Sequence, residues 1–336
     1  MIGLYAALWG LVQGLSPILV PVLGLYDVLR RNRAATLRLL GLLWVFLFAE
    51  LLGVTLAGLL WIRHTLMPGR PRERFLEEHY RLQWWWGRLL LGASARLLNL
   101  RLMVEGDEEA APGPVVVFMR HTSIVDTVLP LVFLGSRHGL RLRYVLKKGL
   151  QLDPCLDLVG GRLPNYFVDR SGETEREIEA VGELAKDLGE RDGVLIYPEG
   201  TRFSARKLAR AREKLAEHDP LLHELSAGLT HVLPPRPGGA LALLDTALPA
   251  GADVVFFAHT GLDHLERMHD VLSGEVLGSV VRLRMWRVSG RSIPVEREAR
   301  LRWLYGQWAR VDAFAAEGGT RSVPAPAPAI EARPSV

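Results

Sequence analysis

The sequence contains a single cysteine, Cys155, in 336 residues. One thiol cannot form an intramolecular disulfide, and it cannot supply a cysteine-based metal cluster. No helix-turn-helix or zinc-finger spacing is present, so we expect no nucleic-acid partner. No Gly-x-Ser-x-Gly elbow is present either, which argues against a lipase or esterase. We interpret Cys155 as a small buried hydrophobic residue rather than a nucleophile.

Charge is almost absent from the N-terminal region. Residues 2–26 carry no charged side chain, and residues 39–62 carry only Glu50. Each segment is long enough to cross ~30 Å of hydrocarbon as a helix. The first segment lacks the basic start and the small-residue cleavage site of a signal peptide, so we expect it to be retained as an anchor. Glu50 is either a functional carboxylate or, as we prefer, a polar residue that faces the partner helix.

The two apolar segments allow two arrangements in a membrane. Clusters of arginines follow each segment, and two full spans would place these clusters on opposite faces, against the positive-inside tendency. Pro17 and Pro21 are expected to break or kink the first helix. A hairpin in a single leaflet would keep both clusters at the cytoplasmic headgroups, and both arrangements stay open. The clusters are Arg30, Arg31, Arg33 and Arg38, then Arg63, Arg70, Arg72 and Arg74.

Overall composition agrees with a membrane-associated protein. Hydrophobic residues make up 49% of the chain, the mean hydropathy is +0.13, and the net charge is +4 with a pI of about 9.4. A mild basic excess beside apolar segments favours an anionic membrane surface as the partner. We therefore expect a lipid bilayer as the main partner of the N-terminal region.

Four regions follow from the pattern along the chain. Residues 1–68 are expected to form a membrane-embedded helical hairpin, and residues 69–100 a connector helix at the membrane interface. The three tryptophans from Trp84 to Trp86 suit the headgroup layer, although an ordinary amphipathic helix packed on the domain is the alternative. Residues 101–318 form an α/β domain. Residues 319–336, rich in proline and alanine, are expected to be a disordered tail.

Short apolar runs alternate with amphipathic stretches in the α/β domain. This alternation predicts a layered sheet flanked by helices. Buried strands are expected at 115–119, 142–146, 166–168, 194–197 and 254–258, and an edge strand at 280–288, where arginines alternate with apolar residues. Helices are expected at about 123–134, 150–159, 173–191, 205–216 and 296–316.

His121 and Asp126 are the first candidates for chemistry. His121 follows the apolar run 115–119, and Asp126 comes five residues later, within the expected helix. A carboxylate at this spacing can reach back to an imidazole at the helix entrance, fix its tautomer and let it act as a general base. By itself, however, such a pair also occurs by chance. Because no second histidine or cysteine lies at ligand spacing, we expect no metal site.

Three arginine-bearing turns follow other strands. Glu199-Gly200-Thr201-Arg202 follows the strand at 194–197, Arg170 follows the strand at 166–168, and Arg236 lies in a proline-rich turn. Glycine lets a backbone approach a ligand closely, arginine binds phosphate with two hydrogen bonds, and a following helix N-terminus favours anions. Each turn alone is more often structural. Together they indicate a ligand site at the carboxyl ends of the strands.

The ordered set of these motifs resembles the glycerolipid acyltransferases, and within them the 1-acyl-glycerol-3-phosphate acyltransferases. The resemblance covers roughly residues 100–259. It is carried by four blocks in order, with further similarity to the eukaryotic-type branch around residues 153–160 and 201–204. The blocks are His121-x4-Asp126, the strand that ends in Arg170, Pro198-Glu199-Gly200-Thr201-Arg202, and Leu233-Pro234-Pro235-Arg236.

The resemblance implies a role for each matched residue. His121 would be the general base and Asp126 its partner. Phosphate of the acceptor would be bound by Arg170, Glu199, Gly200, Thr201 and Arg202, and the acyl-CoA side would be shaped by Pro235 and Arg236. No bound cofactor is implied, because acyl-CoA or acyl-carrier protein is a co-substrate.

The expected activity is acyl transfer to lysophosphatidic acid, giving phosphatidic acid, by a membrane protein whose catalytic domain faces the cytoplasm. Acylation or remodelling of another lysophospholipid, such as lysophosphatidylglycerol or a lysocardiolipin, is the nearest alternative. A catalytically silent lipid-binding scaffold is the alternative of a different class, and it requires that His121 be dispensable.

Overall fold

One mixed sheet organises the part of the chain that the computed structural model describes, which is residues 1–336 except 68, 124, 169–173, 264–275 and 319–336. The order of its strands is β1-β7-β6-β2-β5-β3-β4. Neighbouring strands run parallel except β6 and β7, which are antiparallel. The strands are β1 (Arg101–Glu105), β2 (Val115–Met119), β3 (Arg141–Lys147), β4 (Tyr166–Val168), β5 (Asp192–Ile196), β6 (Asp253–Thr260) and β7 (Val280–Val288).

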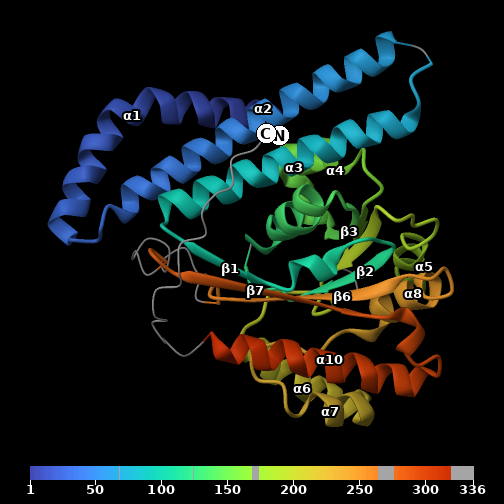
Figure 1. The fold of residues 1–336 in the computed structure, drawn as a ribbon. Helices are drawn as coiled ribbons and strands as arrows, with labels where there is room; N and C mark the ends of the chain where they lie inside the picture. The colour runs from blue at the N-terminus through green and yellow to red at the C-terminus, as the bar shows by residue number, and fades with distance from the viewer. Residues whose placement is uncertain (68, 124, 169–173, 264–275, 319–336) are drawn as a thin grey trace.

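Helices cover both faces of this sheet, which confirms the predicted α/β layers. Figure 1 shows α3 on one face with α2 outside it, and α10 with α6 and α7 on the opposite face. The helices are α1 (Ile2–Arg30), α2 (Ala35–Leu66), α3 (Arg72–Leu97), α4 (Pro154–Gly160), α5 (Glu175–Glu183), α6 (Ala205–His218), α7 (Pro220–Ser226), α8 (Pro237–Ala247) and α10 (Arg297–Glu317).

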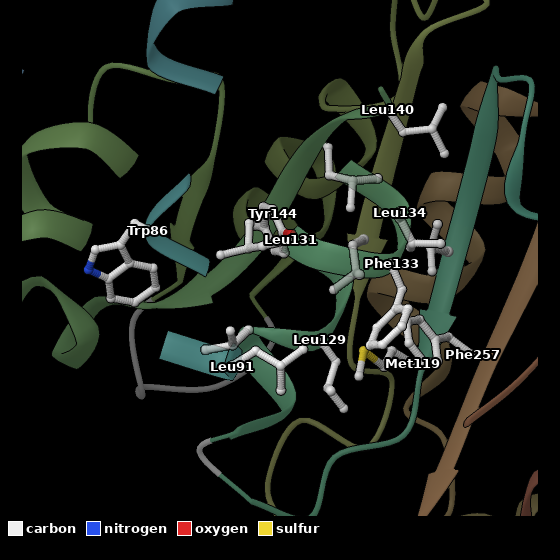
Figure 2. Packing of buried hydrophobic residues seen from close by; sticks show 14 of the residues in the cluster. Trp86, Leu91, Met119, Leu129, Leu131, Phe133, Leu134, Leu140, Tyr144 and Phe257 are labelled. Carbon is white, nitrogen blue, oxygen red and sulfur yellow. The ribbon is translucent and has the colours of Figure 1, made fainter. Parts of the chain in front are cut away.

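The central strands are apolar throughout because each of their faces meets a separate core. In β2, Val115, Val117 and Met119 enter the core on the α3 side, whereas Val116 and Phe118 enter the core on the α10 side. All five side chains of β2 are 0% exposed. A parallel strand that is covered on both faces reads as a continuous apolar run. Figure 2 shows the first core, in which Met119 and Phe257 lie near Phe133 and Leu129.

The prediction that β7 is an edge strand was wrong. β7 lies between β1 and β6, and it pairs with β1 in parallel from Arg101↔Val280 to Glu105↔Arg284. Its alternating arginines reflect one polar face rather than an open edge. The Arg284 Nε lies 2.8 Å from the Glu105 Oε2 on the neighbouring strand β1, so the charge of Arg284 has an ion-pair partner within the sheet.

Three predicted helices differ from the structure. The helix expected at 123–134 is a 3-10 turn at Val125–Thr127 and a π-helical segment at Leu131–Ser136. Pro130 precedes that segment, and since proline has no N–H it cannot make the α-helical bond to residue 126. The helix expected at 150–159 is divided into a 3-10 turn, Lys148–Leu152, and α4. The helix expected at 173–191 ends at Glu183.

The start of α4 shows why the second of these helices divides. Pro154 occupies the first turn, where a missing N–H costs nothing, and Asp153 accepts a hydrogen bond from the Leu156 N–H at 2.9 Å. These are helix-start signals, so the chain begins a new helix there. Helices α7 and α8 were not predicted, and two glycines in the first turn of α8 weaken its helical signal.

The N-terminal hairpin consists of α1 and α2, both long and apolar enough to cross a membrane. Helix α1 contains Pro17 and Pro21 and is bent along its length in Figure 1, as expected from those prolines. The turn into α2 is held by Asp27, whose carboxylate accepts the N–H groups of Thr36 at 3.2 Å and Leu37 at 2.9 Å. A carboxylate at a helix N-terminus satisfies orphan N–H groups and stabilises the helix.

Helix α2 packs directly against the α/β domain. Glu50 accepts hydrogen bonds from the Trp86 indole N–H at 2.9 Å and from the Cys155 backbone N–H at 3.0 Å. Gly53 faces Cys155 so closely that a Cβ there would lie 2.7 Å from its Sγ. Glu50 thus faces α3 and α4 rather than α1, and Cys155 is buried as predicted. Helix α3 packs on the sheet, as expected for an ordinary amphipathic helix of the domain, which is the alternative to a helix at the membrane interface.

Candidate active site

Three adjacent strands end at one edge of the sheet and bring their following residues together. β6, β2 and β5 are parallel neighbours. His121 follows β2, Glu199 follows β5, and His259 lies near the end of β6. Ligand sites in open α/β sheets lie at the carboxyl ends of the strands, so this edge is where chemistry is expected.

His121 and Asp126 form the pair that their spacing predicts. The His121 Nδ1 is 3.2 Å from the Asp126 Oδ2. The His121 side chain is 15% exposed and that of Asp126 is 0% exposed. The imidazole also packs on Tyr197, with ring centroids 4.7 Å apart, and the Tyr197 hydroxyl donates to the Asp126 backbone carbonyl at 3.1 Å. Because Nδ1 is engaged by the carboxylate, Nε2 is the nitrogen left to meet a substrate.

Asp126 is held by the loop on which it lies. Its Oδ2 accepts hydrogen bonds from the backbone N–H of Thr122 at 2.5 Å and of Ser123 at 2.8 Å, and its Oδ1 accepts the Ser123 hydroxyl at 2.8 Å. Burial opposes the charged form, but His259 and His121 outweigh it and hold the pKa of Asp126 far below its usual range. A carboxylate that stays charged fixes the hydrogen of His121 on Nδ1.

Glu199 supports the backbone of His121 from behind. Its Oε1 accepts the His121 N–H at 2.9 Å, and its Oε2 accepts the Leu233 N–H at 2.9 Å. The residue is 2% exposed, and burial raises the pKa of Glu199 to about 7 although both N–H groups and Arg120 act in the opposite direction. Both carboxylate oxygens are used within the protein. Glu199 is therefore a positioning residue. From its place after β5 it holds the backbone of His121, which follows β2, and the backbone of Leu233 in the proline-rich turn.

Gly200 occupies a backbone conformation that suits glycine. Its φ is +66°, and a Cβ at this position would lie 3.0 Å from the Arg236 Nε. The Arg236 N–H donates to the Pro198 carbonyl at 2.8 Å, so the two turns lie one against the other. Arg236 is exposed, and its guanidinium lies over the Gly200 turn.

The backbone of Arg202 lies near His121 because the following residue, Phe203, is hydrogen-bonded to His121. The Phe203 N–H donates to the His121 carbonyl at 2.9 Å, and the Arg202 side chain is exposed. Lys207, in the first turn of α6, donates to the Thr201 hydroxyl at 3.2 Å and to the Arg202 carbonyl at 2.8 Å. The backbone of Arg202 and of Arg236 thus lies at the same edge of the sheet as His121, and both side chains are exposed there, where a guanidinium group could bind an anion.

Pro235 is buried, and its carbonyl accepts the Tyr305 hydroxyl at 3.1 Å, which ties the proline turn to α10. Arg170 lies outside the described residues. Of the residues proposed from the sequence, the structure therefore gathers His121, Asp126, the Glu199-to-Arg202 turn and the Pro235-Arg236 turn at one edge.

Arg120 and His259 belong to this site and were not predicted. Arg120 is 1% exposed, and it donates to the carbonyls of His259 at 2.7 Å and His231 at 2.8 Å while pairing with Asp263 at 2.5 Å. The His259 Nε2 is 3.5 Å from the Asp126 Oδ1. Both residues lie at the end of an apolar strand, as His121 does, and this position is the sequence signal that could identify them.

An apolar cavity adjoins the site. Its volume is about 430 Å³, and it lies between the three N-terminal helices and the 149–156 segment. Thr127 and Val128, which directly follow Asp126, form part of its wall. Other wall residues are Tyr5, Leu42, Phe46, Trp86, Leu90 and Ala93. A volume of roughly 300–1,000 Å³ is usual for small-molecule sites, and this one is suited to an apolar ligand.

Comparisons with known proteins find a family and a solved structure to which this chain is similar. Residues 101–223 match the family model described as Acyltransferase. The fold is similar to the crystal structure of the 1-acyl-sn-glycerophosphate (LPA) acyltransferase PlsC from Thermotoga maritima, with a TM-score of 0.56 and 21% sequence identity over 88% of this chain and 100% of that chain. No curated protein matches the chain. At 21% identity, the structural likeness concerns the fold.

Proposed function

We propose that this chain is a glycerolipid acyltransferase and that it transfers a fatty acyl group from a thioester to the free hydroxyl of lysophosphatidic acid. The match to the Acyltransferase family model and the PlsC-like fold support this proposal. The observation that carries the proposal is the His121–Asp126 pair, at 3.2 Å, at the same sheet edge as the turns that carry the exposed Arg202 and Arg236. A base beside an anion site suits an acceptor that carries both a hydroxyl and a phosphate.

The reaction would proceed by direct attack. The His121 Nε2 accepts the hydroxyl proton while the hydroxyl oxygen forms a bond to the thioester carbonyl carbon. The carbon–sulfur bond then breaks, and the imidazolium returns the proton to the leaving thiolate. The products are an ester, phosphatidic acid, and the free thiol of coenzyme A or acyl-carrier protein. This route uses no acyl-enzyme, metal or bound cofactor.

Arg202 would bind the acceptor phosphate, with Arg170 as a further ligand implied by the family resemblance. The resemblance assigns Arg236 to the acyl-CoA side, but its guanidinium lies over the Gly200 turn, so we propose it as a second phosphate ligand. Both described arginines are exposed. The adjoining N-terminus of α6 adds a favourable field for an anion. Thr201 and Gly200 shape the turn on which Arg202 lies, and Pro235 fixes the turn that carries Arg236 from the opposite side.

The apolar cavity would hold the acyl chain of the donor. Its wall reaches Thr127, one residue beyond Asp126, so a chain within it leads away from the reacting carbonyl. The cavity is bounded in part by Tyr5 and Phe46 of the hairpin, which would give the N-terminal helices a role in substrate binding as well as in anchoring.

Replacing Ala93 with Phe is expected to shorten the preferred acyl chain. Ala93 lines the cavity, and an added ring would occupy volume that a long chain needs. We expect kcat/KM for a C16 donor to fall roughly 10–100-fold relative to a C8 donor. The measurement is the ratio of kcat/KM for the two acyl-CoA donors. Ala95→Phe is the control, because it adds the same ring to α3 at a residue outside the cavity wall. An equal fall in kcat/KM for both donors in Ala93→Phe would contradict the assignment of the cavity to the acyl chain.

The N-terminal helices would bind a lipid bilayer. Along α1 only Val12 and Asp27 are buried, so an apolar helix of 29 residues packs on α2 along one side and leaves most of its side chains exposed. Soluble proteins rarely expose contiguous apolar patches larger than a few hundred square ångströms, roughly 300–600 Å². We propose that this surface lies in the cytoplasmic membrane, with the catalytic domain on the cytoplasmic side.

The test of the proposal is acyl transfer by the purified protein in detergent. Labelled oleoyl-CoA, or the corresponding acyl-carrier protein, is offered with lysophosphatidic acid, lysophosphatidylglycerol and a lysocardiolipin in parallel. Phosphatidic acid as the main product supports the proposal. Transfer to a different head group would replace the acceptor, and no transfer from either donor by folded protein would favour a lipid-binding scaffold.

A further inference from the structure

His259 is an imidazole buried on the far side of Asp126 from His121. It is 0% exposed, and its Nε2 lies 3.0 Å from the Arg120 carbonyl and 3.5 Å from the Asp126 Oδ1. A carbonyl oxygen can only accept a hydrogen bond, so the His259 Nε2 carries a hydrogen. That hydrogen lies between the carbonyl and the carboxylate. The His259 Nδ1 is buried and has no hydrogen-bond partner among the described residues.

Asp126 is thus approached by a different imidazole at each of its oxygens. The His121 Nδ1 is closest to Oδ2, and the His259 Nε2 is closest to Oδ1. In a pair of one histidine and one carboxylate, the whole negative charge acts on the base. A second imidazole that carries a positive charge cancels part of that charge and weakens its pull on the proton of the first.

We propose that His259 is a positioning residue for the acyl transfer, which as an imidazolium partly neutralises Asp126 and thereby keeps His121 in the neutral, proton-accepting form. The proposal rests on the proposed function, because it assigns His121 the role of base. It adds a third member to the His121–Asp126 pair, at a position far along the chain from both.

The carboxylates around His259 favour its charged form, although its buried Nδ1–H would then have no acceptor among the described residues. Burial opposes charge on the ring, but Asp126 outweighs burial, and the pKa of His259 is raised above its usual value. The other charged groups that face it are Arg120, which disfavours its charge, and Asp263, which favours it. Arg120 is itself paired with Asp263 at 2.5 Å, so its charge is largely compensated. Glu199, behind the backbone of His121, is the remaining carboxylate of this group.

Replacing His259 with Gln tests the proposal by a pH profile. Gln can still donate to the Arg120 carbonyl, but it cannot carry a charge. With the full charge of Asp126 acting on His121, the base should hold its proton more strongly. We expect the acid limb of the kcat/KM profile to move to higher pH by about one unit.

A purely structural role for His259 predicts a different result. It would lower the rate by one factor at every pH and leave the acid limb in place, and that outcome would overturn the proposal. His79→Gln is the matched control, because His79 is also 0% exposed but lies on α3 and contacts Phe75 and Arg162 rather than Asp126. It is expected to leave the midpoint of the acid limb unchanged.

A second measurement needs neither a stable variant nor acyl transfer. The ¹⁵N chemical shifts of the imidazole rings in the unmodified protein report which ring nitrogens carry a hydrogen. We expect both nitrogens of His259 to be protonated at pH 7. A neutral His259 at that pH overturns the proposal even if the enzyme is active, whereas an inactive enzyme with a protonated His259 counts against the proposed function alone.

Discussion

The His121→Ala variant is expected to lose nearly all acyl transfer while keeping its fold. Without the imidazole no group is placed to accept the hydroxyl proton, so we expect kcat to fall roughly 10³–10⁴-fold. The fold should survive because the backbone of residue 121 makes the structural bonds. Its N–H donates to Glu199, and its carbonyl accepts from Phe203. Neither bond requires the ring.

The measurement is the initial rate of phosphatidic acid formation, with thermal unfolding of the same preparation as the check on folding. His79→Ala is a suitable comparison, since it removes a buried imidazole of α3 that contacts Phe75 and Arg162 rather than Asp126. A His121→Ala enzyme that retains more than a tenth of the rate would show that another group takes the proton, and the assignment of the base would be withdrawn.

The Asp126→Ala variant is expected to lose both activity and stability. Asp126 accepts hydrogen bonds from two backbone N–H groups, one hydroxyl and the His121 Nδ1. Removing it leaves these donors buried without a partner and frees the imidazole to rotate or change tautomer. We expect kcat to fall about 10³-fold and the free energy of unfolding to fall by about 2–4 kcal/mol.

Asp126→Asn separates the orientation of the base from the charge of the carboxylate. Oδ2 accepts the N–H groups of Thr122 and Ser123, so the amide oxygen of Asn should take this place and still orient the His121 Nδ1–H. The charge is then lost, together with the Oδ1 acceptor that the Ser123 hydroxyl and the His259 Nε2–H face, but the imidazole stays oriented. We therefore expect a smaller fall in kcat than for the Ala variant, roughly 10–100-fold. Rates and denaturant unfolding of the two variants are compared directly. An Ala variant with a rate near that of the unmodified protein would contradict the pairing.

The His121–Asp126 pair could be predicted because its geometry is local. Five residues separate the two, and the loop between them carries the N–H groups that hold the carboxylate. Local spacing does not depend on where the rest of the chain lies. The apolar run of β2 was equally readable, since burial on both faces leaves few polar residues in a strand.

The contribution of His259 could not be read in the same way. It meets Arg120 across a separation of 139 residues, and that contact exists only because β6 pairs with β2. The same limit applies to β7, whose sequence predicts an edge strand although β1, far away in the sequence, pairs with it. Strand order decides both features, and it is a property of the whole chain.

Glu199 illustrates a different limit. The sequence places it correctly in the turn after β5, where the family resemblance implies a phosphate site. The structure turns its carboxylate inward, onto the N–H groups of His121 and Leu233, and leaves the exposed Arg202 on the outer side. A motif thus gives the location of a turn but not which way each of its side chains points.

The docking of α2 on the domain bears on how an embedded enzyme would encounter its acceptor. Glu50 joins α2 to Trp86 and Cys155, and Gly53 allows the close approach to α4. Helix α2 is therefore packed rigidly against the α/β domain and is not connected to it by a flexible linker alone. With the hairpin in a bilayer, the reacting edge would be held at one constant height above the lipid surface. Encounter would then be two-dimensional, and the rate should follow the mole fraction of lysolipid within the surface rather than its concentration in the bulk solution.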